Sequence, residues 1–181
     1  LGAYGDAGAI VTNDTALAEQ MRMFANHGAL KKHEHRMEGI NSRLDSLQAS
    51  ILSAKADHIL NWTQQRIDNA KKYSDLLKDV EGIITPTVRE NTRHTFHLYV
   101  IRTSQRDELK KYLESHSIST AIHYPRALPN LPAYSYLGHK PNDFPVATKY
   151  QSEILSLPLF AELTNTQIEY VCEKIQSFFS S

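Results

Sequence analysis

The 181-residue sequence lacks an excess of charge of either sign, because 20 lysines and arginines balance 20 aspartates and glutamates. It therefore lacks the basic character expected of a general nucleic-acid binder. No apolar run approaches the roughly twenty residues that a membrane-spanning helix needs, and the first residues do not resemble a signal peptide. These absences argue against nucleic acid and membrane as partners.

Cysteine is almost absent, and the single Cys172 cannot form an internal disulfide bond. This residue falls on the apolar side of a predicted helix, where a thiol behaves as a small buried hydrophobic group. A chain without disulfides is compatible with a reducing compartment, so we expect a cytoplasmic protein.

An initiator methionine and a complete glycine-rich phosphate-binding motif are also missing. The sequence opens on Leu1 and runs through Gly2, Gly5 and Gly8 to the apolar run 9–11, which has the composition of a buried strand. These glycines form neither GxGxxG nor a P-loop, so a flexible loop is the simpler interpretation. The opening indicates a piece of a longer protein.

Histidines occur in small groups without a recognised metal-binding spacing. His33 and His35 flank Glu34 in a charged segment that predicts an exposed loop, and His94 and His97 lie further along. A zinc site needs three or four converging ligands, and no pattern such as HExxH occurs here. We therefore expect no metal site, and a metal-binding regulator is a third functional hypothesis.

The segment 39–55 organises the sequence because it joins a polar loop to an apolar helical face. Asn41 and Ser42 are good caps for a helix that we expect to begin near Arg43. A helix start offers free backbone amides and a partial positive charge, and with Asn41 and Arg43 it would suit a phosphate or carboxylate. The alternative is an ordinary capped helix without a ligand.

Periodic patterns along the chain predict alternating helices and strands, and hence an α/β or α+β fold with two lobes. Capping boxes are predicted where Ser104 precedes Asp107 and where Thr164 precedes Gln167. A bend is expected near residues 58–61. Helices are expected from Asp14 towards Gly28, after Ser104, and over about 43–59, 61–78, 143–155 and 164–179, with strands over about 95–102 and 118–123.

Four blocks of sequence carry a resemblance to a known family. They are Leu1-Gly2-Ala3-Tyr4-Gly5-Asp6-Ala7-Gly8, Asn26-His27-Gly28, Gly39 through Gln48 with Lys55, and Ile122-His123-Tyr124-Pro125 continued by Leu155-Ser156-Leu157-Pro158. Together they resemble the DegT/DnrJ/EryC1/StrS sugar aminotransferases, which have the aspartate-aminotransferase fold (fold type I) and use pyridoxal 5'-phosphate. The resemblance spans essentially the whole chain.

The resemblance implies an α/β chain that forms the C-terminal half of such an enzyme. Residues 1–60 would be the end of the large, cofactor-binding domain, residues 61–80 a connecting helix, and residues 81–181 the small α/β domain. Because half of the family fold is missing, we expect self-association to cover exposed apolar surface.

The cofactor-binding lysine of the family lies just before the Gly-Ala-Tyr-Gly-Asp block, outside this sequence. That lysine anchors the cofactor as a Schiff base and serves as the base for proton transfer. None of Lys31, Lys32 and Lys55 takes its position. We therefore assign no catalytic residue and expect the fragment alone to be inactive.

The resemblance also implies binding residues. Asn41 and Arg43 match the part of the family site that reaches across a homodimer interface to the neighbouring subunit's cofactor phosphate, and both side chains are suited to phosphate oxygens. His123 and Tyr124 match a block that borders the sugar-nucleotide pocket, and their alternative role is to end a strand and pack. His35 is a further substrate-side candidate.

One departure from the family pattern bears on the substrate. Where many members read Pro-Leu-His after Tyr-Pro, this chain has Ala127-Leu128-Pro129, which favours a 3-keto over a 4-keto sugar. The resemblance thus implies transfer of an amino group, typically from glutamate, to a nucleotide-linked keto sugar in surface polysaccharide biosynthesis. A non-catalytic structural or interaction module derived from the same fold is the alternative.

Overall fold

The computed structural model describes residues 1–180, which divide into two compact units. The first unit ends at Ile59 and the second begins at Leu60. Among the residues of the first unit only Gly28 and Ala29 are buried, so the apolar core lies in the second unit. Within residues 1–180, none of the helices combines the length and the apolar character that crossing a bilayer requires.

The first helix, α1 (Thr15–Ala25), begins where the sequence predicts. The Asp14 carboxylate accepts a hydrogen bond from the Leu17 backbone N–H at 3.0 Å and satisfies one free amide of the first turn. The strand expected over 9–11 is wrong, because residues 1–14 contain no strand and Val11 is 92% exposed. An apolar run becomes a strand when another strand pairs with it, and no described residue does so here.

Two stretches of backbone, residues 24–29 and 35–42, pair with each other in the first unit. The Ile40 N–H donates to the Phe24 carbonyl at 2.7 Å, and the His27 N–H donates to the Ile40 carbonyl at 3.0 Å. These bonds fold the chain back directly after α1. We refer to them together as the paired stretches.

Two glycines allow the paired stretches to approach. Gly28 has a φ of +80°, and a Cβ on it would lie 1.6 Å from the Met37 carbonyl oxygen. A Cβ on Gly39 would lie 2.3 Å from the Gly28 nitrogen. Atoms cannot approach so closely without a shift of the backbone, so both positions require glycine.

The second helix, α2 (Ser46–Ala56), begins later than the predicted start near Arg43. Asn41 and Ser42 do not cap it, because Asn41 forms a β-bridge with Asn26 and the Ser42 N–H donates to the last carbonyl of α1 at 2.9 Å. Arg43 therefore lies in the segment between this bridge and α2, and not in the first turn of α2. The anion site predicted at a helix start is therefore wrong for Arg43.

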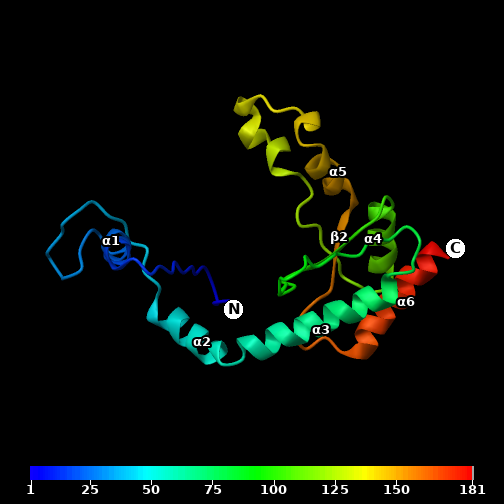
Figure 1. Cartoon of the computed structure of the whole chain (residues 1–181), viewed down its shortest axis with the longest axis horizontal. Helices are drawn as coiled ribbons and strands as arrows, with labels where there is room; N and C mark the ends of the chain where they lie inside the picture. The colour runs from blue at the N-terminus through cyan, green and yellow to red at the C-terminus, as the bar shows by residue number, and fades with distance from the viewer. Residues whose placement is uncertain (181) are drawn as a thin grey trace. The chain divides into compact units, whose positions relative to one another are not determined.

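In the second unit, helices pack around a short antiparallel sheet (Figure 1). Tyr99 of β1 pairs with Leu157 of β2, and α4 packs beside α6. The elements are α3 (Ile59–Leu77), β1 (Tyr99–Arg102), α4 (Arg106–Ser115), β2 (Ile154–Leu157) and α6 (Asn165–Phe179).

The strand predictions for this unit are only partly confirmed. The expected strand over 95–102 is shorter, and the one expected over 118–123 is reduced to a β-bridge between Ala121 and Ser156. The run 143–155, predicted as one helix, contains the start of β2. The pairing partners are distant in sequence, so the local pattern did not indicate them.

The core of the second unit contains two stacked tyrosines. The ring centroids of Tyr73 and Tyr99 lie 5.0 Å apart, and both residues are fully buried. The Tyr73 hydroxyl donates to the Pro158 carbonyl at 3.1 Å, so this buried polar group is satisfied. Cys172 packs in the same cluster, as predicted. The surrounding apolar residues are Leu77, Ile101, Leu109, Leu113, Leu155, Ile168, Val171 and Ile175.

One of the two predicted capping boxes forms. At the start of α6, the Thr164 hydroxyl accepts from the Gln167 N–H at 3.3 Å, and the Gln167 side chain accepts from the Thr164 N–H at 2.9 Å. The box at Ser104 is wrong. There Gln105 is the residue before α4, and its N–H donates to the Thr103 hydroxyl at 3.2 Å.

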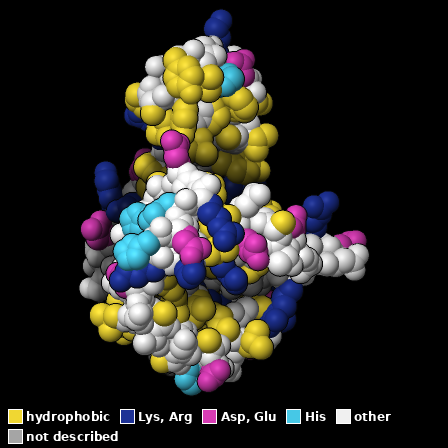
Figure 2. Space-filling model, turned by 90° about the vertical axis from the view of Figure 1, so that its left-hand side faces the viewer, with side chains coloured by type: hydrophobic (Ala, Val, Ile, Leu, Met, Phe, Trp, Pro, Cys, Tyr) yellow, Lys and Arg dark blue, Asp and Glu magenta, His cyan; other side chains and the backbone are white. Residues whose placement is uncertain are grey.

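An arm of short helices extends between β1 and β2 in sequence and projects from the sheet of the second unit (Figure 1). No residue from 121 to 154 is buried, and Figure 2 shows hydrophobic side chains gathered over the arm at the top of the view. Its exposed apolar residues include Leu128, Tyr134, Tyr136 and Leu137. The arm comprises η1 (Leu128–Asn130), η2 (Pro132–Leu137), η3 (Pro141–Asp143) and α5 (Pro145–Glu153).

We expect Gly28→Ala to loosen the first unit, because the new Cβ would collide with the Met37 carbonyl in a backbone conformation that strains an L side chain. Amide hydrogen exchange at Ile40 should accelerate roughly tenfold or more. Gly8→Ala is the control, since no atom lies within 4 Å of its Cβ. Unchanged exchange at Ile40 in Gly28→Ala would show that this contact does not hold the paired stretches together.

Burial makes the second unit sensitive to alkaline pH. It raises the pKa of the Cys172 thiol from 9.0 to about 12 and, in the same direction, raises the pKa of Tyr99 to about 12. The folded chain therefore holds these protons more tightly than the unfolded chain does. Their contribution to stability is fully present below pH 9 for the thiol and is lost as the pH rises towards about 12.

The thiol's share of this effect is tested with Cys172→Ala. Between about pH 8 and about pH 10, the free energy of unfolding of the wild type should fall by roughly 1 kcal/mol more than that of the variant. Urea unfolding at each pH measures both values. Equal losses in the two proteins would mean that Cys172 is not shielded from ionisation in the folded state.

Candidate functional site

The Arg43 guanidinium is held by two asparagine side chains in the first unit. Its Nε donates to the Asn41 Oδ1 at 3.2 Å, and its Nη1 donates to the Asn26 Oδ1 at 3.3 Å. Asn26 is itself oriented, because its Nδ2 donates to the Ala29 carbonyl at 2.6 Å. The β-bridge between Asn26 and Asn41 places both amides beside Arg43. We call these three side chains the Arg43 cluster.

The Arg43 cluster has the charge and the donors of an anion site. Within residues 1–180, no carboxylate forms an ion pair with Arg43. Arg43 and Asn41 are both exposed, and the Asn41 Nδ2 has no partner among the described residues. A forked guanidinium beside a carboxamide donor fits the oxygens of a phosphate group.

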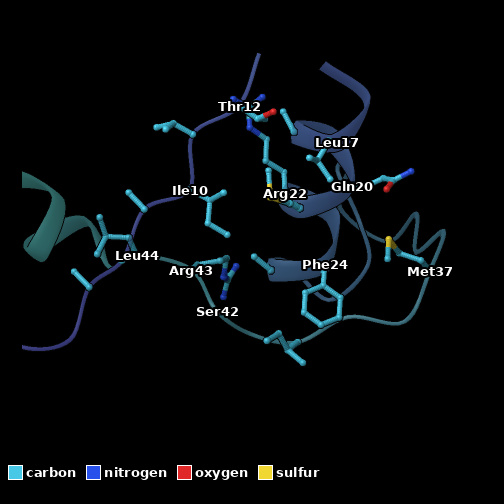
Figure 3. Close-up of a pocket in the computed structure, with 18 of the residues that line it drawn as sticks. Ile10, Thr12, Leu17, Gln20, Arg22, Phe24, Met37, Ser42, Arg43 and Leu44 are labelled. Atoms are coloured by element: carbon cyan, nitrogen blue, oxygen red, sulfur yellow. The ribbon is translucent and has the colours of Figure 1, made fainter. Parts of the chain in front are cut away.

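A cavity of about 1090 Å³ opens beside the Arg43 cluster within the first unit. Figure 3 shows Leu17 and Phe24 of α1, Ile10 of the N-terminal segment and Arg43 around it. Arg22 of α1 also lines it and adds a second positive charge. The cavity therefore combines apolar walls with cationic side chains.

His35 belongs to the paired stretches. Its Nδ1 lies 2.8 Å from the His27 carbonyl oxygen, and because a carbonyl only accepts, this nitrogen carries the proton. The Nε2 of the exposed ring is then left as an acceptor. Residues 1–180 contain no group of three or more histidine, cysteine or acidic side chains arranged to hold a metal ion.

His123 and Tyr124 lie in the second unit, at the base of the arm. The His123 Nδ1 lies 2.9 Å from the Ser156 hydroxyl oxygen of β2. The two rings meet edge to face with centroids 5.5 Å apart, and Tyr124 is 73% exposed. The peptide bond between them is cis.

The structure thus groups the predicted residues in two sets. The first unit holds Asn41, Arg43 and His35, and the second holds His123 and Tyr124. Two further residues contact these sets, Asn26 beside Arg43 and Ser156 beside His123. The sequence indicates them only as members of the family blocks Asn26-His27-Gly28 and Leu155-Ser156-Leu157-Pro158, without a role of their own.

Known proteins resemble this chain along its whole length. A model of the DegT/DnrJ/EryC1/StrS aminotransferase family matches residues 1–176. A "Pleiotropic regulatory protein" of Geobacillus stearothermophilus is 45% identical over 99% of this chain and 49% of its own length. The dTDP-3-amino-3,4,6-trideoxy-alpha-D-glucose transaminase of Streptomyces venezuelae is 35% identical over 98% of this chain and 47% of its own length.

Solved structures agree in fold. The crystal structure of S. venezuelae DesV in complex with a ketimine intermediate matches with a TM-score of 0.95 and 34% identity, covering 100% of this chain and 49% of that one. A family member from Brucella abortus matches with a TM-score of 0.93 and 33% identity, covering 100% of this chain and 48% of that one. The chain spans about half the length of the relatives that it matches.

These matches confirm two predictions made from the sequence. The fold class is that of part of a fold type I, pyridoxal-phosphate-dependent aminotransferase. The resemblance seen in the four sequence blocks is also confirmed, because the family model extends over residues 1–176. The chain belongs to the DegT/DnrJ/EryC1/StrS aminotransferase family.

Proposed function

We propose that the protein carrying this chain is a pyridoxal-phosphate-dependent aminotransferase that acts on a nucleotide-linked keto sugar. The observation that carries the proposal is the Arg43 cluster, a guanidinium oriented by two amides and left without a carboxylate partner, in a chain of this family. Several relatives are named as transaminases of dTDP-linked or UDP-linked sugars. These names support the proposal for this chain.

Asn41 and Arg43 bind the cofactor phosphate in this proposal, and the phosphate belongs to the neighbouring subunit of a homodimer. When bound, pyridoxal phosphate supplies an electron sink for the exchange of the amino group. Arg43 contributes charge and a forked pair of donors, while Asn41 contributes its free Nδ2–H group. Asn26 orients the guanidinium, because its Oδ1 accepts a hydrogen bond from the Arg43 Nη1.

The lysine that anchors the cofactor is not assigned to this chain. Lys31 pairs with Glu34 at 2.5 Å, and the Lys55 ammonium donates to the Gly2 carbonyl at 2.5 Å. Both side chains therefore have other partners. As part of the proposal, residues 1–60 are the end of the large domain, 61–80 the connecting helix and 81–181 the small domain.

The proposed substrate is a 3-keto sugar linked to a nucleotide, with glutamate as amino donor and surface polysaccharide as the product's destination. The run Ala127-Leu128-Pro129 supports this choice, as do relatives named for 3-amino sugars from S. venezuelae and Acidithiobacillus ferrooxidans. His123, Tyr124 and His35 face the substrate in this proposal. Each presents a polar ring at an exposed or half-exposed position.

A non-catalytic interaction module is the second candidate. It is favoured by the names of two relatives, the "Pleiotropic regulatory protein" at 45% identity and the "Erythromycin biosynthesis sensory transduction protein EryC1" at 40% identity. Such a module would keep the fold and lose the cofactor. Cofactor titration separates the two candidates.

We expect the full-length gene product to bind pyridoxal phosphate and to develop the visible absorbance of the lysine-bound cofactor. Borohydride reduction followed by peptide mapping should place the cofactor on a lysine other than Lys31, Lys32 and Lys55. A full-length product without this absorbance would contradict the aminotransferase proposal and support the module. Cofactor found on Lys55 would overturn the assignment of the anchor.

We expect Arg43→Gln to weaken binding of pyridoxal phosphate by roughly tenfold or more, because a charge-assisted bond to the phosphate is lost. Asn41→Asp should weaken it as well, since a carboxylate beside the phosphate is repelled. Titration of the apoprotein, followed by absorbance, gives the dissociation constants.

Two controls isolate the phosphate contact. Arg36→Gln removes the same charge from an exposed arginine of the first unit and should leave affinity unchanged. Pyridoxal, which has no phosphate, should bind Arg43→Gln and the wild type equally. An equal loss of affinity for both forms of the cofactor would show that Arg43 acts on the fold and not on the phosphate.

A further inference from the structure

Ser156 is fixed by backbone pairing on both sides. It lies opposite Val100 of β1, and on the other side its N–H donates to the Ala121 carbonyl at 2.8 Å. Its own carbonyl accepts from the Ala121 N–H at 3.2 Å, and the residue is 4% exposed. The backbone of Ser156 therefore cannot rotate without breaking its pairing with Val100 and with Ala121, and this fixes the direction of the side chain.

The Ser156 hydroxyl has one hydrogen-bond partner within residues 1–180, the His123 Nδ1 at 2.9 Å. If the hydroxyl donates to Nδ1, its proton is satisfied. If Nδ1 carried the proton instead, the buried hydroxyl proton would have no acceptor, and an unpaired buried donor is unfavourable. The geometry therefore selects the tautomer in which Nδ1 accepts and Nε2 carries the proton.

The Nε2–H of His123 is open to a ligand. The only side-chain nitrogen and oxygen atoms of residues 1–180 that are buried without a partner are the Gln65 Oε1 and the Thr120 Oγ1. The His123 Nε2 has no partner and is not one of them, so it reaches the surface. The exposed Tyr124 ring meets the His123 ring edge to face.

We propose that Ser156 is a positioning residue, which holds His123 in the Nε2–H tautomer so that this group donates to a diphosphate oxygen of the nucleotide sugar. This inference rests on the proposed function, which places His123 at the sugar-nucleotide pocket. The anionic diphosphate oxygens are the strongest acceptors that such a ligand offers to an N–H donor.

Nitrogen-15 NMR of the histidine-labelled full-length gene product tests the tautomer. The His123 signals, assigned with His123→Gln, should show an unprotonated Nδ1 and a protonated Nε2. Ser156→Ala should give a mixture of tautomers, and Ser156→Thr, which keeps the hydroxyl on a side chain suited to a strand, should restore the wild-type pattern. Ser152→Ala is the matched control, because this exposed hydroxyl donates to the Lys149 carbonyl.

Titration with dTDP tests the ligand. Adding dTDP should shift the His123 Nε2–H signal of the wild type, whereas thymidine, which lacks the diphosphate, should not. The dissociation constant for dTDP should rise about tenfold in Ser156→Ala and return towards the wild-type value in Ser156→Thr. UDP serves as a second probe with a different base.

The outcomes separate this inference from the proposed function. A protonated Nδ1 in the wild type, or a tautomer unaffected by Ser156→Ala, overturns the positioning role. If dTDP shifts the NMR signals of other histidines but not that of the His123 Nε2–H, the proposed contact between His123 and the diphosphate is wrong. A protein that binds neither dTDP nor UDP contradicts the proposed function, and with it the contact between His123 and a diphosphate. The role of Ser156 in selecting the tautomer is tested separately, by the NMR signals of the protein without ligand.

Discussion

The approach of two backbone stretches at Gly28 and Gly39 fixes the first unit, which has almost no buried apolar side chains to do so. A Cβ at either glycine would lie closer to the opposing backbone than van der Waals contact permits. Hydrogen bonds such as that from the Ile40 N–H to the Phe24 carbonyl then align residues 26 and 41. The position of the Arg43 cluster follows from this alignment.

The second unit is stabilised differently. Its strands are only four residues long, but they carry Tyr99, Ile101, Leu155 and Leu157 into a core that α3, α4 and α6 complete. Burial of these side chains supplies the main favourable free energy. The backbone at Ser156 is rigid because of this core, and the half-exposed His123 takes its orientation from that rigid point.

Short-range signals in the sequence predicted the structure best. Asp14 and Thr164 cap helices through bonds to residues three positions away, so the residue types alone indicate the helix starts. The start at Arg43 was predicted wrongly, because the backbone of Asn41 pairs with Asn26. That pairing depends on chain folding beyond the window in which capping residues are identified.

The candidate sites show the same limit. Arg43 and His123 were identified from the family blocks, but their partners lie 17 and 33 residues away. No periodicity connects residues at such separations, so the roles of Asn26 and Ser156 emerge only from the folded chain.

The amide of Asn26 is engaged at both ends, through its nitrogen with the Ala29 carbonyl and through its oxygen with Arg43. The turn at Ala29 and the guanidinium are consequently coupled through one rigid planar group. An anion bound by Arg43 while Asn26 still holds its Nη1 would therefore restrict the rotation of the whole group. Occupancy of the cluster would then register as altered order in the loop that follows Ala29, at a distance from the anion itself.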